Sequence, residues 1–134
     1  MTRTILLVAT IVSALHLSGQ AYAAQRTSRF IGDGRQVAVL SGVTGHRTIF
    51  VMIGGDPSLK AGTQGDCELR AVERSGSWHL VPFVSDSMEI SAADVRGIQF
   101  SLRATGRRAF RIDTDFGEKN CAAGLSFDGI YRQR

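Results

Sequence analysis

Arginine clustering is the feature of this sequence that points most directly to binding chemistry. Four arginines stand close together: Arg103, Arg107, Arg108 and Arg111. A guanidinium group makes forked hydrogen bonds to carboxylate or phosphate, and arginine is favoured at interfaces. The cluster therefore predicts a surface that binds an anionic partner. The plainer alternative is a charged rim that keeps the edges of strands from associating.

A glycine-rich stretch, Gly54–Gly65, offers a second candidate contact surface. It contains Pro57 and few apolar side chains, a composition typical of a long surface loop. Its charged residues Asp56 and Lys60 are the candidate contacts.

Metal chemistry has weak support. His46 and His79 are the only histidines after the N-terminal segment, and zinc needs three or four nitrogen or sulfur ligands. Asp113, Asp115 and Glu118 could supply oxygen ligands to calcium, but glycine and a missing closing glutamate break the usual loop pattern. The alternative is a polar turn whose Asp side chains bond their own backbone. We assign no metal and no cofactor.

Nucleophilic catalysis lacks a recognisable motif. No serine sits in a Gly-x-Ser-x-Gly elbow, and no pair of carboxylates stands out. Ser77 and His79 would share one face of a strand, which makes them neighbours without aiming one at the other. The sequence therefore favours a protein that is not an enzyme.

The chain has two cysteines, Cys67 and Cys121. In an exported protein two cysteines most simply form one disulfide. A loop of this length would be stabilised by about 4 kcal/mol on the chain-entropy account. A Cys-x-x-Cys redox pair is absent, so we expect a structural crosslink.

The N-terminal segment has the layout of a secretory signal. A basic start is followed by the apolar run Ile5–Leu17, and Ala21-Tyr22-Ala23 supplies the small residues of a cleavage site. The run is too short for a membrane anchor, which needs about twenty residues. We therefore expect cleavage after Ala23, one domain over residues 24–134, and a periplasmic or secreted location without a membrane span.

Charge narrows the choice of partner only slightly. The whole chain has a formal net charge of +4. This excess permits contact with an acidic protein or an anionic envelope polymer. Nucleic acid is not expected, because basic and aromatic residues are not densely interleaved.

The first half of the mature chain would then supply strands. Ala24–Arg29 is expected to be a frayed lead-in, followed by a turn at Gly32–Gly34. Arg35–Leu40 and Thr48–Ile53 have the apolar patterns of strands, and Gly42–Gly45 would join them as a hairpin.

The stretch Asp66–Val84 reads as a central hairpin with two possible registers. A two-residue turn at Ser75-Gly76 pairs Glu73 with Trp78. A three-residue loop pairs Glu73 with Ser77 and turns Trp78 to the surface. A large aromatic is more often buried, so the first register is preferred. It predicts one row of core-facing side chains: Cys67, Leu69, Ala71, Trp78, Leu80, Pro82 and Val84.

A second hairpin spans Gln99–Thr114. Apolar residues alternate along its two arms: Ile98, Phe100 and Leu102, then Phe110 and Ile112. A three-residue loop, Ala104–Gly106, would pair Phe100 with Phe110 and Ile98 with Ile112. That loop requires Gly106 in the left-handed conformation.

The remaining segments complete an all-β pattern. Ser91–Asp94 has the spacing of a capped helical turn, and Asp113–Asn120 reads as an acidic turn. Leu125–Tyr131 would be the last strand, followed by a basic tail, Arg132–Arg134. About seven strands with one short helical turn predict a small antiparallel β-barrel or sandwich.

These features together favour an exported non-enzymatic binding protein that presents turn loops from a rigid β scaffold. In size, signal and strand content the chain is similar to bacterial periplasmic inhibitors of lysozymes or proteases, although Ile31–Gly34 lacks the early cysteine of the lysozyme-inhibitor type. That similarity implies inhibition of a hydrolase as one form of the function. The alternatives are a small cell-envelope hydrolase and a structural envelope component.

Overall fold

The computed structural model describes residues 26–34, 36–54, 67–86, 88–122 and 124–134. Asp56, Lys60 and the expected signal segment lie outside the described residues. The described part contains these elements in chain order: β1 (Thr27–Gly32), β2 (Val37–Ser41), β3 (Thr48–Ile53), β4 (Cys67–Arg74), β5 (Ser77–Leu80), β6 (Phe83–Val84), β7 (Glu89–Ile90), α1 (Ala92–Val95), β8 (Phe100–Gly106), β9 (Ala109–Thr114), α2 (Phe116–Asn120) and β10 (Gly129–Gln133).

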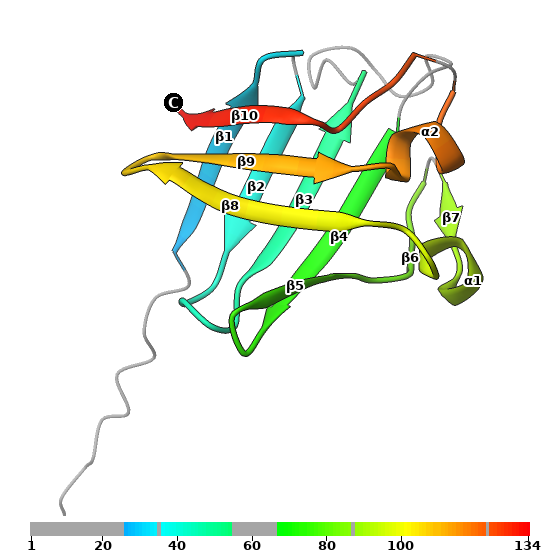
Figure 1. Cartoon of the computed structure of the whole chain (residues 1–134), viewed down its shortest axis with the longest axis horizontal. Coiled ribbons are helices and arrows are strands. Elements are labelled where there is room, and N and C mark those ends of the chain that lie inside the picture. Colours follow the sequence, from blue (N-terminus) through cyan, green and yellow to red (C-terminus); the bar gives the residue numbers. More distant parts are fainter. Residues whose placement is uncertain (1–25, 35, 55–66, 87, 123) are drawn as a thin grey trace, which may run out of the picture.

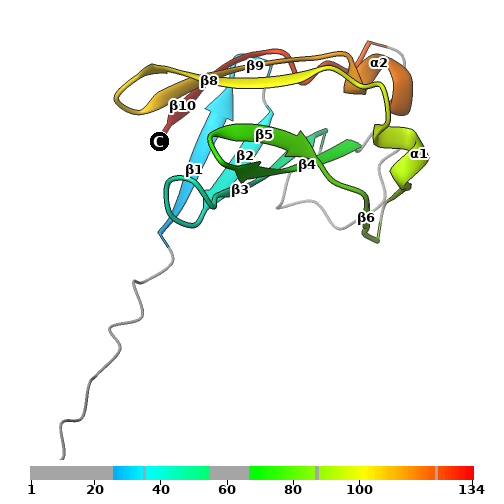
Figure 2. The same ribbon diagram turned by 60° about the horizontal axis from the view of Figure 1, so that its bottom comes forward.

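One antiparallel sheet forms most of the structure. Its strand order is β5-β4-β3-β2-β1-β10-β9-β8, and β6 pairs with β7 in a separate ribbon. The sheet curls until its two edge strands, β5 and β8, lie beside each other, so it is a nearly closed barrel. Figure 1 shows β8, β9 and β10 crossing in front of β1–β4, and Figure 2 shows them as a layer over β1–β5. The expected all-β barrel-like fold is confirmed.

The inward side chains of the barrel form a single core. They alternate with outward side chains along strands such as β3 and β9, as the two-residue period requires. The largest fully buried ones are Tyr131, Phe116, Phe127, Ile49, Leu69 and Ile112. The Phe110 ring lies 4.7 Å from the Phe30 ring and 5.1 Å from the Tyr131 ring, measured between centroids, which joins the β1, β9 and β10 faces.

One end of the barrel is closed by α2 and its surroundings. Phe116 on α2 packs edge-on against Phe127, with ring centroids 5.6 Å apart. Tyr131 Oη donates a hydrogen bond of 2.7 Å to the Phe127 carbonyl. Burial raises the pKa of this phenol, so it remains a donor at any ordinary pH.

The expected disulfide, Cys67–Cys121, is present at the same end. Its two Cα atoms lie 5.8 Å apart, and it joins the first residue of β4 to the residue that caps α2. The bridge therefore fixes the short helix onto the barrel.

The β4–β5 hairpin adopts the preferred two-residue register. Glu73 pairs with Trp78 across the strands. Ser75 and Gly76 both have positive φ angles, 52° and 79°, the geometry of the type I′ turn that matches strand twist. The expected core row is wrong beyond Leu80, however. The chain bends between β5 and β6, so Phe83 is buried while Pro82 and Val84 are exposed.

The β8–β9 hairpin has a different register from the one predicted. The turn lies at Arg107-Arg108, and Phe100 pairs with Thr114 in place of Phe110. A bulge at Thr105 lies between Ala104 and Gly106. It lets both strands extend through the residues that were expected to form the loop, so Gly106 pairs with Ala109. The alternation of apolar residues along the arms is nevertheless as expected, because a slip by an even number of residues preserves the faces.

Three further segments differ from the sequence-based expectation. Thr27–Arg29 belongs to β1 and pairs with β2, so these three residues of the expected lead-in are strand. The segment after β9 forms helix α2, because burial of Phe116 fixes its backbone against the core. The last strand begins at Gly129 and ends at Gln133, so it includes part of the expected basic tail.

The short helix at Ser91 is confirmed, with a complete capping box between Ser91 and Asp94. Across the described ranges, neither α1 nor α2 nor any other helical segment has the length and apolarity needed to span a bilayer.

Candidate functional site

A hollow opens at the end of the barrel opposite α2. Its volume is about 300 Å³, near the lower end for small-molecule sites. Its walls come from β1, β2, the β2–β3 connection, the β4–β5 hairpin and the β8–β9 hairpin: Phe30, Leu40, Arg47, Glu73, Gly76, Trp78, Leu102, Ala104, Gly106, Arg107, Arg108, Ala109 and Phe110. We call this hollow the barrel mouth.

A charged pair forms one wall of the barrel mouth. Arg47 donates two hydrogen bonds to Glu73, Nε to Oε1 at 3.0 Å and Nη2 to Oε2 at 2.6 Å. The Glu73 side chain is only 5% exposed, and the backbone amide of Gly45 also donates to it. The Arg47 guanidinium in turn lies 5.5 Å from the centre of the Trp78 ring, in cation–π contact.

The protonation state of this wall is fixed by its own contacts. Hydrogen bonds from Arg47 hold the pKa of the Glu73 carboxyl below its ordinary value, and the Gly45 amide adds to that effect against the opposing cost of burial. The same hydrogen bond raises the pKa of Arg47. Glu73 therefore stays ionised and positions Arg47 and Trp78. It is poorly suited to accept a proton.

Arg107 and Arg108 form the turn of the β8–β9 hairpin and line the rim of the barrel mouth. Both are exposed, and neither side chain forms an ion pair with a described residue. Their charges are free to meet a ligand or partner.

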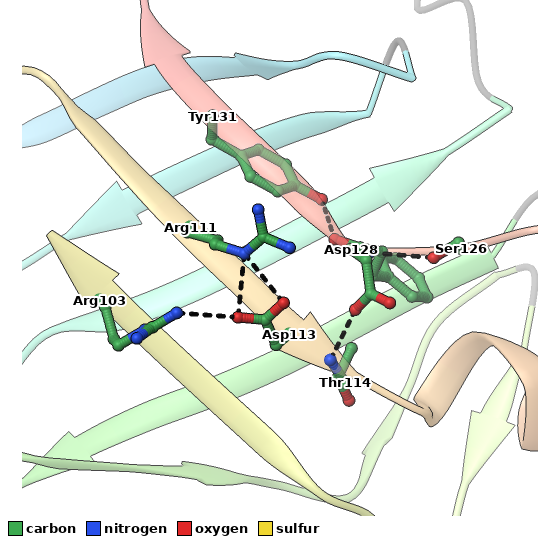
Figure 3. A network of polar contacts seen from close by, with 8 residues as sticks. Arg103, Arg111, Asp113, Thr114, Ser126, Asp128 and Tyr131 are labelled. Atoms are coloured by element: carbon green, nitrogen blue, oxygen red, sulfur yellow. Dashed lines mark hydrogen bonds and ion pairs between the residues drawn. The ribbon is translucent and has the colours of Figure 1, made fainter. Parts of the chain in front are cut away.

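Arg103 and Arg111 lie elsewhere on the same hairpin, on the outer face of the barrel. They are direct cross-strand partners. Arg111 Nε donates to both oxygens of Asp113 at 3.0 and 3.1 Å, and Arg103 Nη2 donates to the same carboxylate at 3.4 Å (Figure 3). One carboxylate therefore serves two guanidiniums, and this face keeps a positive charge.

The structure thus splits the predicted arginine cluster into two groups. Arg107 and Arg108 lie at the barrel mouth, whereas Arg103 and Arg111 lie on the outer face. Because the hairpin turn falls at residues 107 and 108, all four belong to one hairpin, as the sequence predicted.

The acidic residues after β9 are engaged in structural contacts. Asp113 is bound by arginines, and Asp128 accepts from the Thr114 amide (Figure 3). Asp115 accepts from Lys119 at 2.8 Å and from the Gln99 amide, and these contacts hold its pKa below the ordinary value. No group of three or more metal-ligating side chains occurs among the residues that the structure describes.

The remaining predicted residues do not join the site. His46, Ser77 and His79 are exposed. Sequence reasoning missed the Arg47–Glu73 wall, although the register that pairs Glu73 with Trp78 already placed those two side chains together. No sequence pattern pointed to Arg47, because it lies in the connection between β2 and β3 and not in the hairpin that contains Glu73 and Trp78.

Comparisons with known proteins add no identity. No protein-family model, no curated protein and no solved structure matches this chain. The functional argument therefore depends on the geometry described above.

Proposed function

We propose that this protein is an exported, non-enzymatic binding protein that recognises an anionic partner through its β8–β9 hairpin. The observation that carries the proposal is the charge arrangement of this hairpin. Like charges directly opposite each other on paired strands are destabilising, yet Arg103 faces Arg111. Asp113 offsets only part of that cost, since a single carboxylate serves both.

The exposed turn supports the same proposal. Arg107 and Arg108 add two guanidiniums, neither of which forms an ion pair with a described residue, at the turn of a two-stranded hairpin. Arginine can engage carboxylates in bidentate fashion, so an acidic protein surface or an anionic envelope polymer is the partner chemistry that fits. Inhibition of a hydrolase, with the hairpin placed against an acidic active-site cleft, is one form of this function.

Export is part of the proposal. The Cys67–Cys121 bridge is what an oxidising compartment favours, which fits a periplasmic or secreted location.

The test uses a charge-matched pair of double variants. We expect Arg107→Ala/Arg108→Ala to weaken capture of partners from envelope extract by about tenfold, as loss of charge-assisted hydrogen bonds predicts. Because both side chains are exposed and form no ion pair with a described residue, the Tm should stay within about 2 °C of the parent. Arg96→Ala/Arg134→Ala removes the same charge outside the hairpin and should leave capture unchanged.

Binding should also weaken with added salt, since screening acts on exposed charges. Equal capture by the hairpin variant and the parent would remove the hairpin tip from consideration. Turnover of a cell-wall or peptide substrate by the purified protein, lost on changing one carboxylate, would contradict the non-enzymatic assignment.

A further inference from the structure

The barrel mouth combines positive charge at its rim with an apolar interior. Three arginines and one carboxylate, that of Glu73, line it. The carboxylate is already paired with Arg47 through two hydrogen bonds. Arg107 and Arg108 therefore leave uncompensated positive charge at the rim. Apart from these groups and the Trp78 indole, the lining is apolar or glycine: Phe30, Leu40, Gly76, Leu102, Ala104, Gly106, Ala109 and Phe110.

The apolar part of the mouth is built in advance. Trp78 is half-buried and held by its contact with Arg47, which Glu73 fixes through two hydrogen bonds. Phe110 is only 4% exposed and packs against Phe30, so the floor is part of the core. A preorganised pocket of this kind binds without the cost of ordering its walls.

We propose that the barrel mouth binds a small amphiphilic carboxylate, such as a medium-chain fatty acid. The apolar tail lies against Trp78 and Leu102, and the carboxylate meets Arg107 and Arg108 at the rim. Trp78, Leu102 and Phe110 offer apolar contacts to the tail, and the guanidiniums at the rim offer hydrogen-bond donors to the carboxylate. This site is distinct from the outer arginine face and does not depend on a macromolecular partner.

The single tryptophan of the chain makes the proposal directly measurable. Titration of the full-length folded protein with decanoate should give a saturable change in Trp78 fluorescence and a matching calorimetric isotherm. Acetate lacks the tail and 1-decanol lacks the charge, so each should bind at least about tenfold more weakly than decanoate.

Two variants separate pocket from rim. Ala104→Phe fills the mouth from β8 and should weaken decanoate binding at least about tenfold, whereas Ala93→Phe, on exposed α1, should not. Arg107→Ala/Arg108→Ala should weaken decanoate and leave 1-decanol unchanged. Protection of Trp78 from iodide quenching by decanoate is a readout on the parent protein that needs no variant.

The outcomes distinguish this site from the proposed function. Arg103→Ala/Arg111→Ala should reduce capture of a macromolecular partner and spare decanoate binding, and Ala104→Phe should do the reverse. Absence of saturable decanoate binding, equal binding of decanoate and 1-decanol, or undiminished binding by Ala104→Phe would each overturn the inference.

Discussion

At the scale of single residues, the Arg47–Glu73 pair anchors one wall of the barrel mouth. It places an ion pair at the inner edge of an apolar barrel, where the carboxylate is shielded and the guanidinium is partly open to solvent. Such a pair costs desolvation energy, so its strength depends on the extra donors around it. Here the Gly45 amide and the Trp78 ring supply those contacts.

Replacing Glu73 with Gln should therefore destabilise the fold by about 2 kcal/mol, because charged hydrogen bonds to a shielded partner are lost. Urea unfolding monitored by circular dichroism would measure it. Glu89→Gln, which neutralises an exposed carboxylate on β7, is the matched control and should change stability by less than about 0.5 kcal/mol.

The same pair predicts a dependence on pH. The folded-state pKa of Glu73 is below its ordinary value of 4.5, so the unfolded chain binds the proton more readily. This stabilisation is present in full above about pH 4.5 and is lost as the pH falls through the folded-state pKa. The free energy of unfolding should consequently decline less in acid for Glu73→Gln than for the parent. Identical slopes for both proteins would contradict this.

At the scale of elements, helix α2 shows how a close approach of two backbones constrains one residue. Gly117 lies against the segment that leads to β10, and a Cβ atom there would stand 2.5 Å from the Leu125 carbonyl oxygen. Real Cβ atoms do not approach backbone atoms so closely. Helix α2 can therefore occupy this position only with glycine at residue 117.

Gly117→Ala should accordingly destabilise the protein by roughly 1–3 kcal/mol, despite the higher helix propensity of alanine. Gly106→Ala is the matched control, because its Cβ would meet only the Ala109 side chain at 4.0 Å. Thermal melting of both variants tests the contrast. Similar Tm values for the two would show that α2 can shift to make room.

The elements also show which parts of the fold can be predicted from sequence. Alternation with period two identified β3 and the β4–β5 register, because burial of Trp78 distinguishes the two possible pairings. The Thr105 bulge has no signature in the residue types, and it moved the second turn onto Arg107-Arg108. Helix α2 was hidden because its acidic residues resemble a turn, whereas the buried Phe116 decides its conformation.

The candidate site was predictable only in part, for the same reason. The arginines of the hairpin are close in sequence, so their clustering was visible. The mouth depends on contacts between strands far apart in the chain, such as Arg47 with Glu73, and those follow only from the curvature of the sheet.

At the scale of the whole molecule, the barrel has one braced end and one open end. The disulfide, α2 and the Tyr131 hydrogen bond all lie at the braced end, whereas the barrel mouth and the turns of the β4–β5 and β8–β9 hairpins lie at the other. A rigid body that supports an exposed recognition end is typical of binding proteins.

Removal of the bridge tests this division. Cys67→Ala/Cys121→Ala should lower the free energy of unfolding by about 4 kcal/mol, mainly through the greater freedom of the unfolded chain. Below the new melting transition, decanoate affinity should remain within about twofold of the parent, because the mouth lies at the opposite end. A large loss of affinity in the folded variant would show that the two ends are coupled.

The line where the two edge strands β5 and β8 lie near each other, here called the seam, has a further consequence for self-association of this protein. The terminal strands of a sheet carry backbone groups that commonly recruit another chain, and here the two terminal strands lie near each other without a ladder between them. A neighbouring molecule that adds a strand to one of these edges would have to compete with the other terminal strand for the space beside it. Self-association through sheet extension should thus be slow in the native state and become rapid only when heat or acid parts the seam.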